Sequence, residues 1–158
     1  MGAWISLWLA AHSPLRNRIS GILLIAPALN FFRPEFARIL CRVSAAERAA
    51  LENGAAVDIH DSSLGRVVPL RKSFVDATVR YELDPSALAA ISGNIPVSIL
   101  HGVGDEVVPY RGSLDIMEQL GSNGVEVTLV KGADHRFCDE SCLLLLQDKL
   151  DKMIEQLK

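Results

Sequence analysis

Two short polar segments carry the residues of this sequence that could do chemistry. Asp105 follows the apolar run at residues 97–100 and a Gly-Val-Gly turn, and His135 follows a second strand-like run at residues 125–130. Imidazole changes its charge near neutral pH and can both take and return a proton. A carboxylate can hold such a ring in one tautomer. The two residue types therefore predict a general base, His135, that is oriented by an acid, Asp105.

The elements around these two residues must bring them together. The apolar periodicity predicts a strand over residues 18–27, with its core at Ile22–Ile25, and further strands at 97–100 and 125–130. Helices are predicted at residues 111–120 and 139–157. Strands that alternate with helices form a parallel sheet, and the carboxyl ends of its strands share one edge. The predicted class is α/β, with Asp105 and His135 at that edge.

The rest of the chain is predicted to belong to the same domain as these elements. Residues 2–12 are expected to form a buried helix. Residues 29–91 are irregular and have the position of a cap-like insertion. Within them Ser44 opens a predicted capping-box helix, and residues 73–81 are expected to form a second short helix. No repeat or linker indicates a second domain, so residues 1–158 are interpreted as a single incomplete α/β domain.

The order of acid and base along the chain also suggests where a nucleophile would lie. α/β-Hydrolases present serine, then aspartate, then histidine, and the start Met1-Gly2-Ala3 resembles the residues that follow the serine in a G-x-S-x-G elbow. The serine would then precede Met1. The chain would be truncated before its nucleophile and inactive as given. Met1 would occupy the oxyanion-hole position, although its amide is here an amino terminus.

Residues 95–157, together with the Met-Gly-Ala-Trp start, resemble the small α/β-hydrolases of the mitochondrial palmitoyl-protein thioesterase and acyl-glucuronide esterase group and its bacterial relatives. This resemblance implies hydrolysis of carboxylic esters or thioesters, on a small molecule or a protein, through an acyl-serine and without a cofactor or metal. Asp105 and His135 match the motifs of the group. The alternative is a non-catalytic hydrolase-fold remnant that acts as a binding or interaction module. Upstream sequence that encodes Gly-x-Ser in frame would favour the enzyme.

Composition excludes some classes of partner and leaves the location open. The chain is 49% hydrophobic and 22% charged, with a net charge of -3, and it has no dense basic cluster. Nucleic acid is therefore not an expected partner. The apolar start is too short to span a bilayer and lacks a basic flank. Three cysteines match no disulfide framework, which favours a reducing compartment, and the resemblance is compatible with mitochondria.

Several other residues are candidates for alternative catalytic groups or for structural residues of the site. Glu106 and Asp134 are competing carboxylates, but Asp134 adjoins His135 and is expected to point elsewhere. His101 closes a strand and is expected to support the Asp105 loop by hydrogen bonding. Ser63 is followed by the trailing glycine of an elbow, yet no strand precedes it.

A zinc site is a further alternative. His135, Cys138 and Cys142 could be imagined around zinc, but a fourth ligand is missing. Cys142 begins an apolar run and is predicted to be a core cysteine.

Overall fold

The computed structural model describes residues 1–61, 65–91 and 93–157. The chain divides into two compact units: a sheet unit, formed by Met1–Leu29 and Leu83–Lys158, and a hairpin unit, formed by Asn30–Glu82. The expectation of a single domain with a cap-like insertion at residues 29–91 stays a prediction.

A parallel three-stranded sheet forms the centre of the sheet unit. Its strand order is β1 (Ile22–Ile25), β4 (Val97–Gly102), β5 (Val125–Val130). Every residue of β4 is buried, as expected for a central strand that is covered on both faces. The α/β class predicted from the sequence is confirmed. Because all three strands run in the same direction, their carboxyl ends share one edge.

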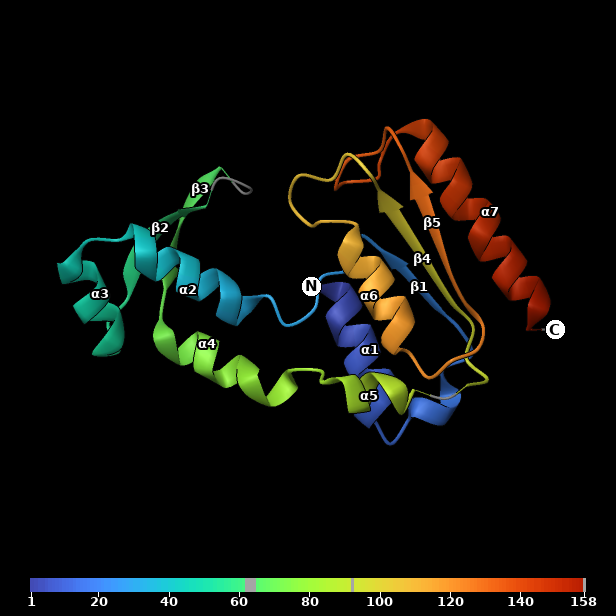
Figure 1. The fold of residues 1–158 in the computed structure, drawn as a ribbon, viewed down its shortest axis with the longest axis horizontal. Coiled ribbons are helices and arrows are strands. Elements are labelled where there is room, and N and C mark those ends of the chain that lie inside the picture. Colours follow the sequence, from blue (N-terminus) through green and yellow to red (C-terminus); the bar gives the residue numbers. More distant parts are fainter. Residues whose placement is uncertain (62–64, 92, 158) are drawn as a thin grey trace. The chain divides into compact units, whose positions relative to one another are not determined.

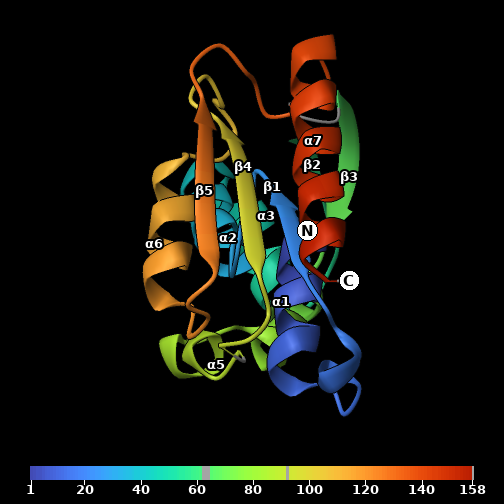
Figure 2. The same ribbon diagram turned by 90° about the vertical axis from the view of Figure 1, so that its right-hand side faces the viewer.

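Helices cover both faces of this sheet. Helices α1 (Gly2–His12) and α6 (Arg111–Gln119) lie on one face and α7 (Glu140–Gln156) lies on the other (Figure 1). The short helix α5 (Pro85–Ala89) contacts both α1 and α6. Figure 2 shows the three strands side by side, with α1 antiparallel to them so that the N-terminus points toward their carboxyl ends. No helix within the described ranges is long and apolar enough to cross a bilayer.

The buried side chains of α1 and α7 explain how these helices attach to the sheet. Helix α1 buries Trp4 and Leu7, and α7 buries Cys142 and Met153. Helix α7 begins where the Asp139 side chain accepts a hydrogen bond from the Cys142 N–H at 2.9 Å. Such a cap satisfies one of the backbone donors that the first turn of a helix leaves unpaired.

In its described residues, the hairpin unit combines an antiparallel strand pair with three α-helices. Strands β2 (Val57–Asp61) and β3 (Arg66–Leu70) pair in register, and the helices are α2 (Phe32–Arg42), α3 (Ala45–Glu52) and α4 (Lys72–Thr78). The predicted capping box is present, because the Ser44 side chain accepts from the Glu47 N–H while the Glu47 carboxylate accepts from the Ser44 N–H. Phe32 and Phe74 join α2 to α4 in an edge-to-face contact with centroids 5.0 Å apart.

Two boundaries differ from the sequence-based prediction. The strand expected at residues 18–27 is limited to Ile22–Ile25, because Arg16–Arg18 forms a 3-10 turn before it and Ala26 adopts a left-handed backbone conformation after it, with φ 44°. The helix expected at residues 73–81 ends at Thr78 and continues as a 3-10 turn, Val79–Tyr81.

Candidate active site

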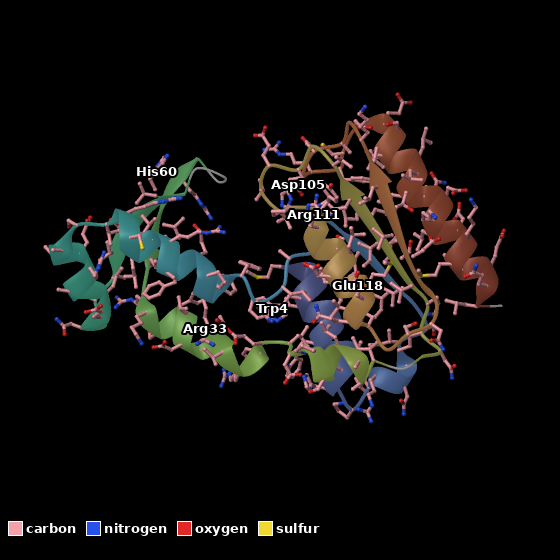
Figure 3. The ribbon with its side chains drawn as sticks, in the orientation of Figure 1. Trp4, Arg33, His60, Asp105, Arg111 and Glu118 are labelled. Atoms are coloured by element: carbon pink, nitrogen blue, oxygen red, sulfur yellow. The ribbon has the colours of Figure 1, made fainter. Side chains whose placement is uncertain are left out.

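Asp105 lies in the loop of residues 103–110 between β4 and α6, called here the Asp105 loop, and its side chain is fully buried (Figure 3). Oδ1 accepts hydrogen bonds from the backbone N–H groups of Val107, at 2.8 Å, and Val108, at 2.7 Å. Oδ2 lies 2.8 Å from Nδ1 of His135 and 3.1 Å from Nε2 of His101. The carboxylate is thus held in one orientation by donors on both oxygens.

These contacts decide the charge of the carboxylate. Burial by itself raises the pKa of Asp105, because a low-dielectric environment disfavours the charged form. The hydrogen bonds from Val108, His135 and Val107 have the opposite effect and outweigh it, so the pKa lies below its ordinary value. Asp105 is therefore ionised at neutral pH and accepts hydrogen bonds on both oxygens.

His135 lies in the loop of residues 131–139 between β5 and α7, called here the His135 loop. Asp134 shapes this loop, since its Oδ1 accepts from the backbone N–H groups of Arg136, at 2.9 Å, and Phe137, at 3.1 Å. Phe137 has φ 51° and is only 2% exposed. It packs in a core cluster with Leu100, Ala133 and Cys142. A buried aromatic ring thus anchors the loop that presents the imidazole.

The two loops are joined through backbone hydrogen bonds that Val103 and Gly104 donate. The Val103 N–H donates to the Val130 carbonyl at 2.8 Å, and the Gly104 N–H donates to the Ala133 carbonyl at 3.0 Å. A Cβ atom on Gly102 would collide with the Ala133 carbonyl oxygen. Glycine is therefore required at this close approach, which brings Asp105 within hydrogen-bond distance of His135.

The exposure of the His135 ring differs from that of its partner. Its side chain is 41% exposed, while that of Asp105 is 0% exposed. Asp105 contacts Nδ1, so the carboxylate favours the tautomer with a proton on Nδ1 and leaves Nε2 as the basic nitrogen. A partly exposed imidazole with a basic Nε2 can take a proton from a hydroxyl group placed beside it.

The structure thus brings Asp105 and His135 together, whereas their catalytic roles stay predictions. His101 was expected to support the Asp105 loop, and its hydrogen bonds to Asp105 and to the Val108 carbonyl confirm that contact. Its other partner, Ser113 on α6, was missed. A single serine in an amphipathic helix gives no sequence signal of this kind.

The competing interpretations fare differently. Asp134 binds backbone N–H groups of its own loop, as expected, and Glu106 is exposed. Cys142 is a core cysteine, as predicted, and burial raises the pKa of its thiol to about 11. The described residues contain no group of three or more His, Cys, Asp or Glu side chains that could hold a metal ion.

The structure does not test the roles considered for Ser63, the alternative nucleophile, and Met1, the oxyanion-hole residue. Ser63 lies outside the described residues. Met1 is 64% exposed at the start of α1, where its carbonyl accepts from the Ile5 N–H at 3.3 Å. Its assignment to an oxyanion hole stays a prediction.

Solved structures of other proteins share the fold of this chain. The chain superposes on a protein from Agrobacterium vitis described as a putative hydrolase, with 26% identity and a TM-score of 0.76, covering 98% of this chain and 58% of that one. It superposes on mouse α/β-hydrolase domain-containing protein 10 with 23% identity and a TM-score of 0.71, covering 99% and 59%. The chain carries a partial α/β-hydrolase fold.

The sequence comparison agrees with the fold. The human mitochondrial palmitoyl-protein thioesterase ABHD10 is 34% identical over 64 residues, which are 40% of this chain and 21% of the relative. The chain thus resembles this α/β-hydrolase over a minor part of the relative's length. No family model matches the chain.

Proposed function

We propose that this chain supplies the acid and the base of a serine hydrolase that cleaves carboxylic esters or thioesters, in the manner of an acyl-protein thioesterase. The hydrogen bond of 2.8 Å between the buried Oδ2 of Asp105 and Nδ1 of the half-exposed His135 carries the proposal. The names of the similar proteins support it, since they include a hydrolase and a palmitoyl-protein thioesterase. The substrate would be an acyl ester on a small molecule or a protein.

The nucleophile in this proposal is a serine directly before Met1 in a longer polypeptide. Two observations support that position. The residues after it, Met1-Gly2-Ala3, resemble those of a nucleophile elbow. Helix α1 also points its N-terminus toward the carboxyl ends of the strands, where the Asp105 and His135 loops begin. In the longer polypeptide the Met1 N–H would be an amide and would provide one donor of the oxyanion hole.

The chemical steps follow from the two side chains. Nε2 of His135 takes the hydroxyl proton while the serine oxygen attacks the acyl carbonyl carbon, and Asp105 stabilises the resulting imidazolium. When the tetrahedral intermediate collapses, the carbonyl reforms and His135 gives the proton to the departing alcohol or thiol. Water then attacks the acyl-serine by the same route, which releases the carboxylic acid and restores the serine hydroxyl.

Probe labelling of two proteins tests the proposal: the 158-residue chain and a form extended upstream to include the Gly-x-Ser segment. A fluorophosphonate reacts with activated serines. We expect it to label only the extended form, and we expect His135→Gln in that form to abolish labelling. The matched control is His12→Gln, because His12 is an exposed histidine at the far end of α1.

Two other outcomes would overturn the proposal. If the chain as given were labelled, the nucleophile would lie within it, and Ser63 would be the first residue to substitute. If neither folded form reacted with the probe or hydrolysed a thioester, the molecule would be a hydrolase-fold binding module.

A further inference from the structure

A second imidazole lies on the same carboxylate oxygen as His135, and the mechanism above does not use it. His101, the fifth residue of β4, is 0% exposed. Its Nε2 lies 3.1 Å from Oδ2 of Asp105 and 3.0 Å from the Val108 carbonyl oxygen. Its Nδ1 lies 2.6 Å from the hydroxyl oxygen of Ser113, which is also 0% exposed. The ring therefore links α6 to the Asp105 loop through the interior.

The partners of His101 determine its proton positions. Nε2 faces a carboxylate oxygen and a carbonyl oxygen, and neither of these can donate, so Nε2 must carry a proton. The Ser113 hydroxyl can donate to Nδ1, which satisfies the ring as a neutral imidazole.

The same contacts complete the hydrogen bonding of Asp105. Oδ1 accepts from two backbone N–H groups, and Oδ2 accepts from His135 and His101. An ionised carboxylate has about four acceptor positions, and all of them are thus used. A carboxylate with both oxygens occupied cannot rotate without losing donors in a buried environment, where each lost donor costs free energy.

We propose that His101 is a positioning residue: its Nε2–H, with the ring held by the Ser113 hydroxyl, fixes Oδ2 of Asp105 at the point where Nδ1–H of His135 binds it. This inference rests on the proposed function, because positioning has a catalytic consequence only if His135 is the base. His101 acts through Asp105 and does not touch the reacting atoms. The structural part of the inference concerns the folded chain itself and needs neither nucleophile nor substrate.

Nuclear magnetic resonance of the chain with isotope-labelled histidine tests the structural part. We expect His101 to carry its proton on Nε2 only, and the Nδ1 proton of His135 to be visible and protected from exchange with water. A proton on Nδ1 of His101, or protons on both ring nitrogens, in the unsubstituted folded chain would overturn the proposal. That outcome does not depend on any variant folding.

Substitutions then test whether His101 positions Asp105. His101→Leu should speed exchange of the His135 Nδ1 proton about tenfold, the effect of losing one hydrogen bond of ordinary strength. His101→Gln should recover most of the protection, because its amide nitrogen can donate near the position of Nε2. Ser113→Ala should give an intermediate effect. The matched control is Ser122→Ala, because the Ser122 hydroxyl is buried and binds the Ile95 carbonyl away from the site.

If exchange at His135 were unchanged in folded His101→Leu or folded Ser113→Ala, the positioning role would be rejected. The extended form adds a kinetic test, in which His101→Leu lowers kcat about tenfold with KM unchanged and His101→Gln rescues it. Normal kcat in His101→Leu would reject the positioning role while leaving the hydrolase intact. Absence of activity in the unsubstituted extended form would instead reject the proposed function.

Discussion

The Asp105 loop and the His135 loop are joined at one edge of the sheet, but they are held by different kinds of interaction. The Asp105 loop is organised around a buried charge that accepts from two backbone N–H groups and two imidazoles. The His135 loop is anchored by an apolar ring, Phe137, that is buried in the core. The first arrangement fixes a carboxylate away from water. The second leaves the His135 imidazole half-exposed on a loop that the buried Phe137 ring anchors.

This difference suggests which interactions the site depends on. Loss of the aromatic anchor should release the His135 loop as a whole, whereas loss of the charge should disturb only the hydrogen bonds that converge on it.

The largest effect is expected for Phe137→Ala. Removing a buried aromatic ring from a packed cluster costs about 3–5 kcal/mol of the free energy of unfolding. Urea denaturation followed by circular dichroism would measure this loss. The matched control is Phe74→Ala, because the Phe74 side chain is 49% exposed and makes an edge-to-face contact in the hairpin unit. That variant should lose no more than about 1.5 kcal/mol. Similar losses in the two variants would contradict the anchor.

Gly102→Ala should separate the two loops from each other. The added methyl group meets the Ala133 carbonyl oxygen, so the backbones must move apart at a cost of about 3 kcal/mol, the upper range for overpacking. Gly132→Ala is the matched control, because a Cβ atom there would meet no atom within 4 Å. It should change the free energy of unfolding by less than about 0.5 kcal/mol. Equal stability of the two variants would show that the loops can separate freely.

The sheet unit shows how much of this arrangement the sequence predicts. Strands β4 and β5 and helices α1 and α7 follow from strand-like apolar runs or helical periodicity. The order of acid and base after two strands then predicted that Asp105 and His135 meet. The contact between His101 and the Asp105 loop also followed from its place at a strand end.

The hairpin unit shows why the rest was not predicted. Helix α2 has no fully buried residue, although Phe32, Phe36 and Ile39 recur at helical spacing and are partly buried, and this amphipathic pattern was overlooked within the irregular stretch around it. Strand β3 contains Pro69 and is mostly exposed, and a proline within an apolar run argues against a strand on sequence grounds. Phe137 was missed as an anchor because its left-handed backbone and its burial depend on packing against distant residues.

Asp105→Asn should lower the free energy of unfolding by about 2 kcal/mol at neutral pH. The amide group would place its N–H donors against the imidazole donors that now face Oδ2. This effect depends on pH. The folded-state pKa of Asp105 is lowered, so its ionised form stabilises the fold above the unfolded-state pKa of about 3.9, and this stabilisation is lost as pH falls through the folded-state pKa.

The difference in stability between the unsubstituted chain and Asp105→Asn should therefore shrink below about pH 4. Denaturation series at neutral and acidic pH would measure it. Asp115→Asn, at an exposed position of α6, is the matched control and should show no such convergence. A difference that stayed constant down to low pH would show that the charge of Asp105 does not stabilise the fold.

The smallest effect is expected for Asp134→Ala, which removes the carboxylate that shapes the His135 loop from within. Its Oδ1 accepts from two backbone N–H groups, but the residue is exposed, so water can replace the lost acceptor and the cost should be about 1 kcal/mol. Because Phe137 still anchors the loop, the Nδ1 proton of His135 should remain protected by Asp105. If that protection were lost while global stability changed little, Asp134 and not the buried ring would be the residue that holds His135 in place.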